Sequence, residues 1–189
     1  SQALREVAAY YAVAAPEEKD SLVDPLLAAS ETARRIGAFD TLAEAVNALL
    51  LRGDSVAREL LDDDVRASMA GLLGKIRDES ERKALIEVYG KLGESIAQAI
   101  ADALAETEDR LARKAYIGAL CDFGQTGLRV VEEMLQDPQW FVVRNGVSVL
   151  GEIGGEKAVE LLTSTLASPN VKVRRETVLS LSKIGGEDA

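Results

Sequence analysis

Apolar residues recur along most of the chain at spacings of three and four positions, the pattern of an amphipathic helix. In residues 139–153 this stripe comprises Val142, Val143, Val147, Leu150 and Ile153. Asp137 and Pro138 precede it and suit a helix start, whereas Gly154 suits the left-handed residue that ends a helix. No segment keeps the two-residue alternation of a strand, so the pattern predicts an all-α protein.

The same periodicity predicts the bounds of the individual helices. We expect them over residues 2–14, 18–36, 40–52, 54–62, 64–77, 79–92, 95–106, 109–123, 126–136, 139–152, 156–167 and 169–184. Asp24-Pro25 is expected to break or kink the second helix, because proline lacks the backbone N–H and disfavours a helical residue before it.

The second half of the chain repeats itself. Gly93, Gly124, Gly154 and Gly185 recur at spacings of 31, 30 and 31 residues. We therefore divide the chain into divergent N-terminal helices over 1–62 and repeats over 63–93, 94–124, 125–155 and 156–186, each a pair of antiparallel helices.

One such helix pair cannot bury its apolar faces alone, so neighbouring pairs must stack. The prediction is one all-α solenoid of about five or six repeats, an α-α superhelix, over residues 1–189. Small residues at the helix crossings are expected to let backbones approach closely: Ala70, Gly71, Gly90, Ala115, Gly118, Ala119 and Gly146.

Composition narrows the chemistry that such a solenoid could support. The chain has no His and one Cys, Cys121, which excludes His-dependent triads, His-ligated metal and haem sites, and an intrachain disulfide. A net charge of −10 disfavours nucleic-acid binding, which needs a clustered basic surface. We expect no cofactor, no metal site and no enzymatic activity.

Targeting signals are weak. The longest early apolar run, Val7 to Ala15, is too short to span a bilayer, so no membrane association is expected. A lone cysteine fits a reducing cytoplasm, which is the expected location. The abrupt ends suggest a fragment of a longer protein.

Two segments of the second half of the chain resemble a known repeat family. The segment from Asp137 to Gly154, DPQWFVVRNGVSVLGEIG, and the segment from Ser168 to Gly185 are similar to HEAT-like repeats of the short-period type, found in phycobilin lyases and in many bacterial proteins. The resemblance is strong over 137–186, good over 79–136 and weak before. It implies that the second helix of each pair lines the concave face, and that the protein is a binding scaffold.

Aligning the repeats exposes two columns of basic residues near the starts of the second helices. The first column comprises Arg82, Arg113 and Arg174, where another repeat has Val143. The second column comprises Lys83, Lys114, Arg144 and Arg175. We expect the first column to be free for the carboxylates of a partner. The second is expected to form an internal ladder with turn acids such as Asp78, Glu108, Asp109 and Asp137.

Trp140 is a further candidate contact residue, because Trp is enriched at interface hot spots, although packing in the core is the favoured reading. Trp140 and Phe141 are adjacent, so one ring is expected to pack and the other to be partly exposed. The acidic runs 62–64 and 106–109 lack the spacing of a calcium loop and are read as helix caps and turns. Cys121 is expected to be a partly buried filler.

Three functions stay open. The first is a non-enzymatic scaffold that binds a protein or peptide on its concave face. The second is a structural spacer or regulatory segment of a larger bacterial signalling protein, and the third is an enzyme like the bilin lyases. The sequence specifies neither a partner nor an oligomeric state.

Overall fold

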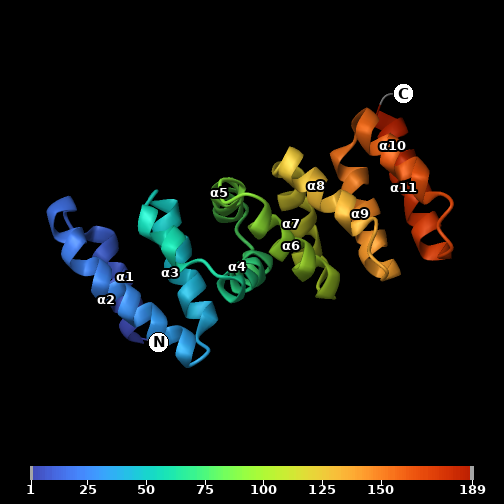
Figure 1. The fold of residues 1–189 in the computed structure, drawn as a ribbon. Coiled ribbons are helices and arrows are strands. Elements are labelled where there is room, and N and C mark those ends of the chain that lie inside the picture. Colours follow the sequence, from blue (N-terminus) through green and yellow to red (C-terminus); the bar gives the residue numbers. More distant parts are fainter. Residues whose placement is uncertain (1, 188–189) are drawn as a thin grey trace. The chain divides into compact units, whose positions relative to one another are not determined.

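The computed structural model describes residues 2–187, which form helices joined by turns and contain no strand. These residues form two compact units, divided between Val88 and Tyr89. Figure 1 shows helices following one another along the chain in each unit, joined by short turns. The all-α fold class predicted from the periodicity is confirmed.

The first unit contains α1 (Gln2–Val13), α2 (Pro16–Arg35), α3 (Phe39–Leu51), a 3₁₀ segment (Ser55–Leu60) and α4 (Asp63–Lys75). The division from the second unit falls inside α5 (Glu79–Gly90). These bounds lie close to the predicted ones, except that 54–62 was expected to be an ordinary helix. Of the predicted break or kink at Pro25, the break is wrong, because α2 continues through that residue.

Polar contacts fasten the helices of the first unit to one another. Asp54, after α3, accepts the ammonium of Lys19 at 2.5 Å and the hydroxyl of Tyr11 at 3.2 Å. Arg34, in the last turn of α2, bonds the carboxylate of Asp62 at 2.6 Å and the carbonyl of Leu60 at 2.7 Å. These contacts bring the ends of α1, α2 and α3 together around apolar residues such as Leu26, Leu42 and Leu49.

The second unit consists of three helix pairs. They are α6 (Glu94–Glu106) with α7 (Arg110–Asp122), α8 (Gln125–Met134) with α9 (Trp140–Ile153), and α10 (Gly155–Thr165) with α11 (Val171–Glu187). The second helices pack in succession, α7 on α9 and α9 on α11, and α6 packs on α8 (Figure 1). This is the predicted stack of antiparallel pairs, with a core of aliphatic residues such as Ile96, Ile100, Leu120 and Leu150.

Glycines play different parts from those expected. Gly154 has a φ of +67° and ends α9, as predicted. At Gly185, by contrast, α11 continues. A Cβ on Gly146 would lie 3.2 Å from the Cβ of Met134, so the predicted close approach is confirmed there. It is wrong for Gly71 and Gly118, where a Cβ would meet nothing within 4 Å.

Within the residues that the structure describes, no helix combines the length and the apolar character needed to cross a membrane.

Candidate functional site

The first basic column is not free, contrary to expectation. Each of its arginines donates to the backbone carbonyl six residues upstream: Arg82 to Ile76 at 3.4 Å, Arg113 to Thr107 at 2.7 Å, and Arg174 to Ser168 at 2.7 Å. These carbonyls lie at or just beyond the C-terminal ends of the first helices.

The antiparallel hairpin explains this arrangement. The start of each second helix lies beside the end of the first, where the last carbonyls have no partner within the helix and carry the negative end of its dipole. A cation that is mildly unfavourable for its own helix is therefore favourable for the helix before it. The effect on the preceding helix depends on the packing of the hairpin, which the local sequence does not specify.

The second column forms no uniform ladder with the turn acids. Lys83 pairs with Glu79 of its own helix at 3.1 Å, and Arg144 donates to Asn145 at 3.0 Å. Lys114 and Arg175 form no hydrogen bond or ion pair with any described residue.

The turn acids instead cap the second helices. The carboxylate of Asp78 accepts the backbone N–H of Glu81 at 2.8 Å. That of Asp109 accepts the N–H of Leu111 at 2.7 Å, and that of Asp137 accepts the N–H of Gln139 at 2.7 Å. This is the usual role of Asp before a helix.

Asn145 is the polar centre of the second unit, and sequence reasoning missed it. Its side chain is only 3% exposed. Its Oδ1 accepts Nη1 of Arg113 at 2.9 Å and Nη2 of Arg144 at 3.0 Å, while its Nδ2 donates to the carbonyl of Leu104 at 3.1 Å. The available signal was a lone carboxamide on the otherwise apolar stripe of α9.

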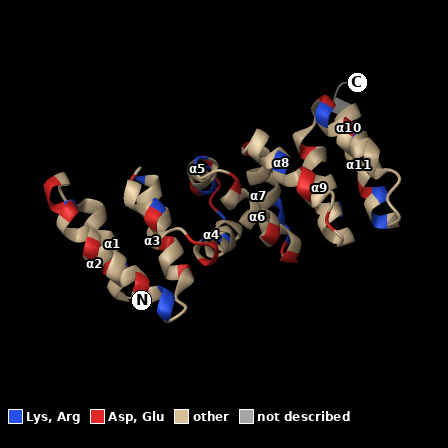
Figure 2. Cartoon of the chain, viewed as in Figure 1, with Lys and Arg blue, Asp and Glu red and all other residues tan. Residues whose placement is uncertain are grey.

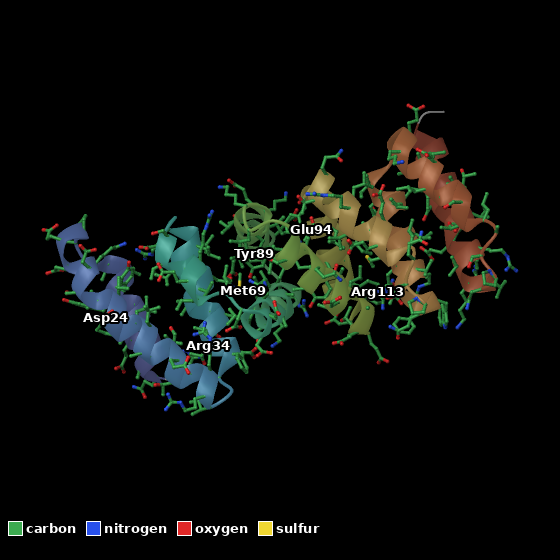
Figure 3. The ribbon with its side chains drawn as sticks, viewed as in Figure 1. Asp24, Arg34, Met69, Tyr89, Glu94 and Arg113 are labelled. Carbon is green, nitrogen blue, oxygen red and sulfur yellow. The ribbon has the colours of Figure 1, made fainter. Side chains whose placement is uncertain are left out.

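Burial also affects the pKa of Arg113, which bonds Asn145. Desolvation, and then the positive charge of Arg144, lower the pKa of Arg113, while Glu176 acts in the opposite direction. Arg113, labelled in Figure 3, is thus held by two hydrogen bonds, one to the Asn145 carboxamide and one to the Thr107 carbonyl. Its guanidinium is fixed in place at the edge of a cavity.

That cavity, which we call the α7 groove, has a volume of about 440 Å³. Its lining is Arg110, Arg113, Lys114, Ile117, Gly118, Cys121, Asp122 and Glu152. All but the last lie on α7, with the cations at its start and Asp122 at its end. The basic segment near α7 is blue in Figure 2. Arg110 and Lys114 are exposed, and neither bonds another described residue.

Cys121 lies in the α7 groove and is half-buried, as expected of a filler. Burial, followed by the nearby carboxylates of Glu152 and Asp122, raises its pKa to about 12. A thiol with this pKa is almost entirely protonated at neutral pH and is a poor nucleophile.

Trp140 and Phe141 are both half-buried, so neither ring is fully packed, whereas one was expected to pack and the other to be partly exposed. Their rings meet edge to face, 6.0 Å apart. The ammonium of Lys172 lies 4.5 Å from the centre of the Trp140 ring, and the guanidinium of Arg144 lies 5.8 Å from it. Trp140 thus joins the start of α9 to the start of α11.

The first helices of the repeat pairs, α6 and α8, present acidic residues instead of the basic ones of α7. A cavity of about 520 Å³ between α6 and α8 is lined by four carboxylates, those of Asp102, Glu106, Glu133 and Asp137. Within the described part of the chain, no group of three or more His, Cys, Asp or Glu residues is placed to hold a metal ion.

Part of the second unit is similar to a known repeat family. Residues 97–182 match the family model for HEAT repeats, and no curated protein sequence matches the chain. Human deoxyhypusine hydroxylase in complex with glycerol is 17% identical, over 98% of this chain and 89% of that one, with a TM-score of 0.38. An engineered protein is 17% identical over 98% and 90% (TM-score 0.32), and a designed armadillo repeat protein 13% identical over 96% and 99% (TM-score 0.30). The stacked helix pairs of residues 97–182 therefore match HEAT repeats, and the described part of the chain is all-α.

Proposed function

We propose that the chain is a non-enzymatic protein-interaction module that binds an acidic segment of a partner protein in the α7 groove. The observation that carries the proposal is the pair of exposed cations Arg110 and Lys114, which have no partner among the described residues of a chain with a net charge of −10. Unpaired cations beside an apolar floor are what a carboxylate-bearing partner would satisfy.

Arg113 supports the same reading. Two of its N–H groups are taken by Thr107 and Asn145, which fixes the guanidinium at the groove, and the remaining N–H groups are available. A guanidinium held in place loses little side-chain entropy when it binds a carboxylate. Ile117 and Gly118 would supply the apolar contact area.

The length of the groove sets the size of the ligand. From Arg110 to Cys121 the helix rises about 17 Å at 1.5 Å per residue. An extended segment of about five residues covers that distance. At the far end Asp122 would repel a uniformly acidic peptide, while Glu152 is already paired with Lys183. The ligand we expect is therefore acidic at one end and apolar or basic at the other.

The test is fluorescence anisotropy with a panel of labelled synthetic peptides, each with Glu or Asp at one end and Leu at the other. We expect micromolar binding that weakens as salt is raised, because exposed charges are screened. The double change Arg110→Glu and Lys114→Glu should abolish binding. The matched control is Arg129→Glu with Lys157→Glu, which alters the net charge equally at exposed residues outside the groove.

If no peptide in the panel binds, or if both double variants bind as the unaltered chain does, the α7 groove is not an interaction site. A structural spacer or regulatory segment would then be the better description of the chain. No residue that lines the groove is aromatic, so nothing there favours an enzyme of the bilin-lyase type.

A further inference from the structure

The last helix pair exposes apolar side chains along a continuous strip. On α11, Val171 is 65% exposed, Val178 57% and Leu179 55%. With Arg175 and Ser182, also exposed, they lie on one side of the helix at spacings of three, four and seven residues. Val159 of α10 and Leu166, just after that helix, are also partly exposed. We call the α11 residues Val171, Arg175, Val178, Leu179 and Ser182 the α11 strip.

In the preceding repeat, the surface that corresponds to the α11 strip is largely covered. One period of 31 residues earlier, the position of Val178 is Val147, which is fully buried, and the positions of Val171 and Arg175 are Trp140 and Arg144, which are half-buried. The cover for this earlier surface is α11 itself, whose Ser180 hydroxyl donates to the Val147 carbonyl at 3.1 Å. The α11 strip thus continues an interface that already exists between α9 and α11.

The α11 strip differs from the corresponding α9 surface at two residues, and these differences indicate what kind of helix could pack on it. Gly151 lets α11 approach α9 closely, since a Cβ there would lie 2.6 Å from the Ser180 hydroxyl. The corresponding residue of α11 is Ser182, and Ser148 corresponds to the larger Leu179. A helix that covers the strip therefore lies farther away than α11 lies from α9, and it needs large apolar side chains to fill the space.

The cations of α11 indicate which residues the flank of a partner helix would carry. The described side chains of α11 up to Lys183 include four cations, Lys172, Arg174, Arg175 and Lys183, against one acid, Glu176, in a chain whose net charge is −10 (Figure 2). Lys183 is paired with Glu152 and Arg174 with backbone carbonyls. Arg175 bonds no described residue, although it stands between Val171 and Val178.

We propose that the α11 strip is a second interaction surface, which docks an acidic amphipathic helix of a partner protein. The apolar face of that helix covers Val171, Val178 and Leu179, and a carboxylate on its flank pairs with Arg175. From Val171 to Ser182 the strip is about 17 Å long, so a helix of about three turns covers it. The surface shares no residue with the α7 groove, and the inference goes beyond the function proposed for that groove.

Other occupants are separate possibilities that the observations favour less. A second copy of the chain that paired through the same strip would place Arg175 and its neighbouring cations against their own copies, a repulsive arrangement. A membrane surface rich in anionic lipid would repel a chain of this charge, and the strip has no Trp or Phe to anchor it. The experiment distinguishes these occupants.

The experiment measures the anisotropy of a labelled helix-forming peptide of about 16 residues, with Leu at alternating third and fourth positions and Glu on both flanks. We expect binding to the 189-residue chain and loss of binding in Val178→Glu, because a charge replaces the apolar centre of the strip. Arg175→Glu should weaken binding about tenfold, through loss of a pair and gain of a repulsion. Both residues are exposed, and circular dichroism checks that the variants stay folded.

Two controls complete the design. The double variant Arg110→Glu and Lys114→Glu should bind this peptide as well as the unaltered chain does, which separates the α11 strip from the α7 groove. A peptide with Lys in place of Glu should bind at least tenfold more weakly. No binding of the acidic peptide, or equal binding of both peptides, overturns the proposal. So does sedimentation that shows self-association abolished by Val178→Glu, or binding to phosphatidylserine vesicles that the same change removes.

Discussion

Arg113 on α7 donates to the carboxamide oxygen of Asn145 on α9 across 2.9 Å, and the same carboxamide donates to the Leu104 carbonyl near the end of α6. One buried side chain therefore joins three helices from two successive repeats. Arg144 adds a second guanidinium to the same oxygen at 3.0 Å. The edge of the α7 groove thus depends on a residue that does not line it.

Replacing Asn145 with Leu should lower the free energy of unfolding by about 2–4 kcal/mol, because the buried Leu104 carbonyl loses its donor and two guanidinium groups lose an acceptor. Urea denaturation followed by circular dichroism measures the loss. Gln125→Leu, at an exposed position without a polar partner among the described residues, is the control and should change stability by about 0.5 kcal/mol or less. Similar losses in the two variants would mean that the network adds little.

The three arginines of the first basic column should differ in their contribution to stability, according to the number and length of their hydrogen bonds. We expect Arg113→Gln to destabilise by about 2 kcal/mol, Arg174→Gln by about 1 kcal/mol, and Arg82→Gln by about 0.5 kcal/mol or less. Arg113 and Arg174 each form two bonds of 3.0 Å or shorter, whereas the Arg82 contact is 3.4 Å. Thermal melts of the single variants give the order. Three unchanged midpoints would restore the earlier expectation of a free column.

The fold was largely predictable because its signals are local. Apolar stripes, the Asp and Pro at helix starts, and Gly154 at a helix end each act within a few residues, so most helix bounds agree closely with the prediction. The exceptions have local causes too. The 3₁₀ segment Ser55–Leu60 is too short for a reliable helical stripe, and α2 continues through Pro25, which is exposed.

The candidate site was predictable only in part, because its contacts join residues far apart in the sequence. The repeat alignment located both basic columns. It could not show that the end of a first helix lies beside Arg113, or that Asn145 of the next repeat reaches the same guanidinium. The small residues show the same limit. Gly118 has an open side, whereas Gly127, which was not singled out, lies against the backbone of Leu120.

That difference between two glycines is testable. A Cβ on Gly127 would lie 1.9 Å from the Leu120 carbonyl oxygen, a backbone atom that cannot move aside alone, so Gly127→Ala should destabilise by about 3 kcal/mol or more. Gly118→Ala is the matched change within a helix and should stabilise by about 0.5–1 kcal/mol. Chemical denaturation of both variants measures the difference. Equal effects would show that α7 and α8 are not packed this closely.

The contact of Lys172 with Trp140 should contribute a small, measurable coupling between successive repeats. A double-mutant cycle of Lys172→Gln and Trp140→Leu is expected to give about 0.5–1 kcal/mol, the range of partly exposed cation–π pairs. The control cycle combines Lys157→Gln with Trp140→Leu, because Lys157 pairs with Glu160 instead. A coupling near zero in both cycles would indicate that Lys172 is solvated rather than held over the ring.

Cys121 should be far less reactive in the folded chain than in the unfolded chain. Its pKa is raised to about 12 by burial and by Glu152 and Asp122, whereas an unfolded cysteine has a pKa of about 8.5. At pH 8 the folded thiolate fraction is about one in ten thousand, against about one in four when unfolded. Reaction with a chromogenic disulfide reagent should therefore accelerate at least about a thousandfold on unfolding. A folded-state rate near the unfolded rate would contradict the raised pKa.

The same shift predicts how stability depends on alkaline pH. The folded state favours the neutral thiol, so its contribution to stability is fully present below the unfolded pKa of about 8.5. It is lost as the pH rises from there toward the folded pKa of about 12, because the unfolded chain ionises first. The pKa values of Tyr11 and Tyr116 are also raised, chiefly by burial, so they destabilise the folded chain at high pH in the same direction. The measurement is therefore a comparison of urea denaturation between pH 8 and pH 10 for the unaltered chain and for Cys121→Ala. The variant should lose less stability over this range, and parallel curves would show that the thiol ionises equally easily in both states.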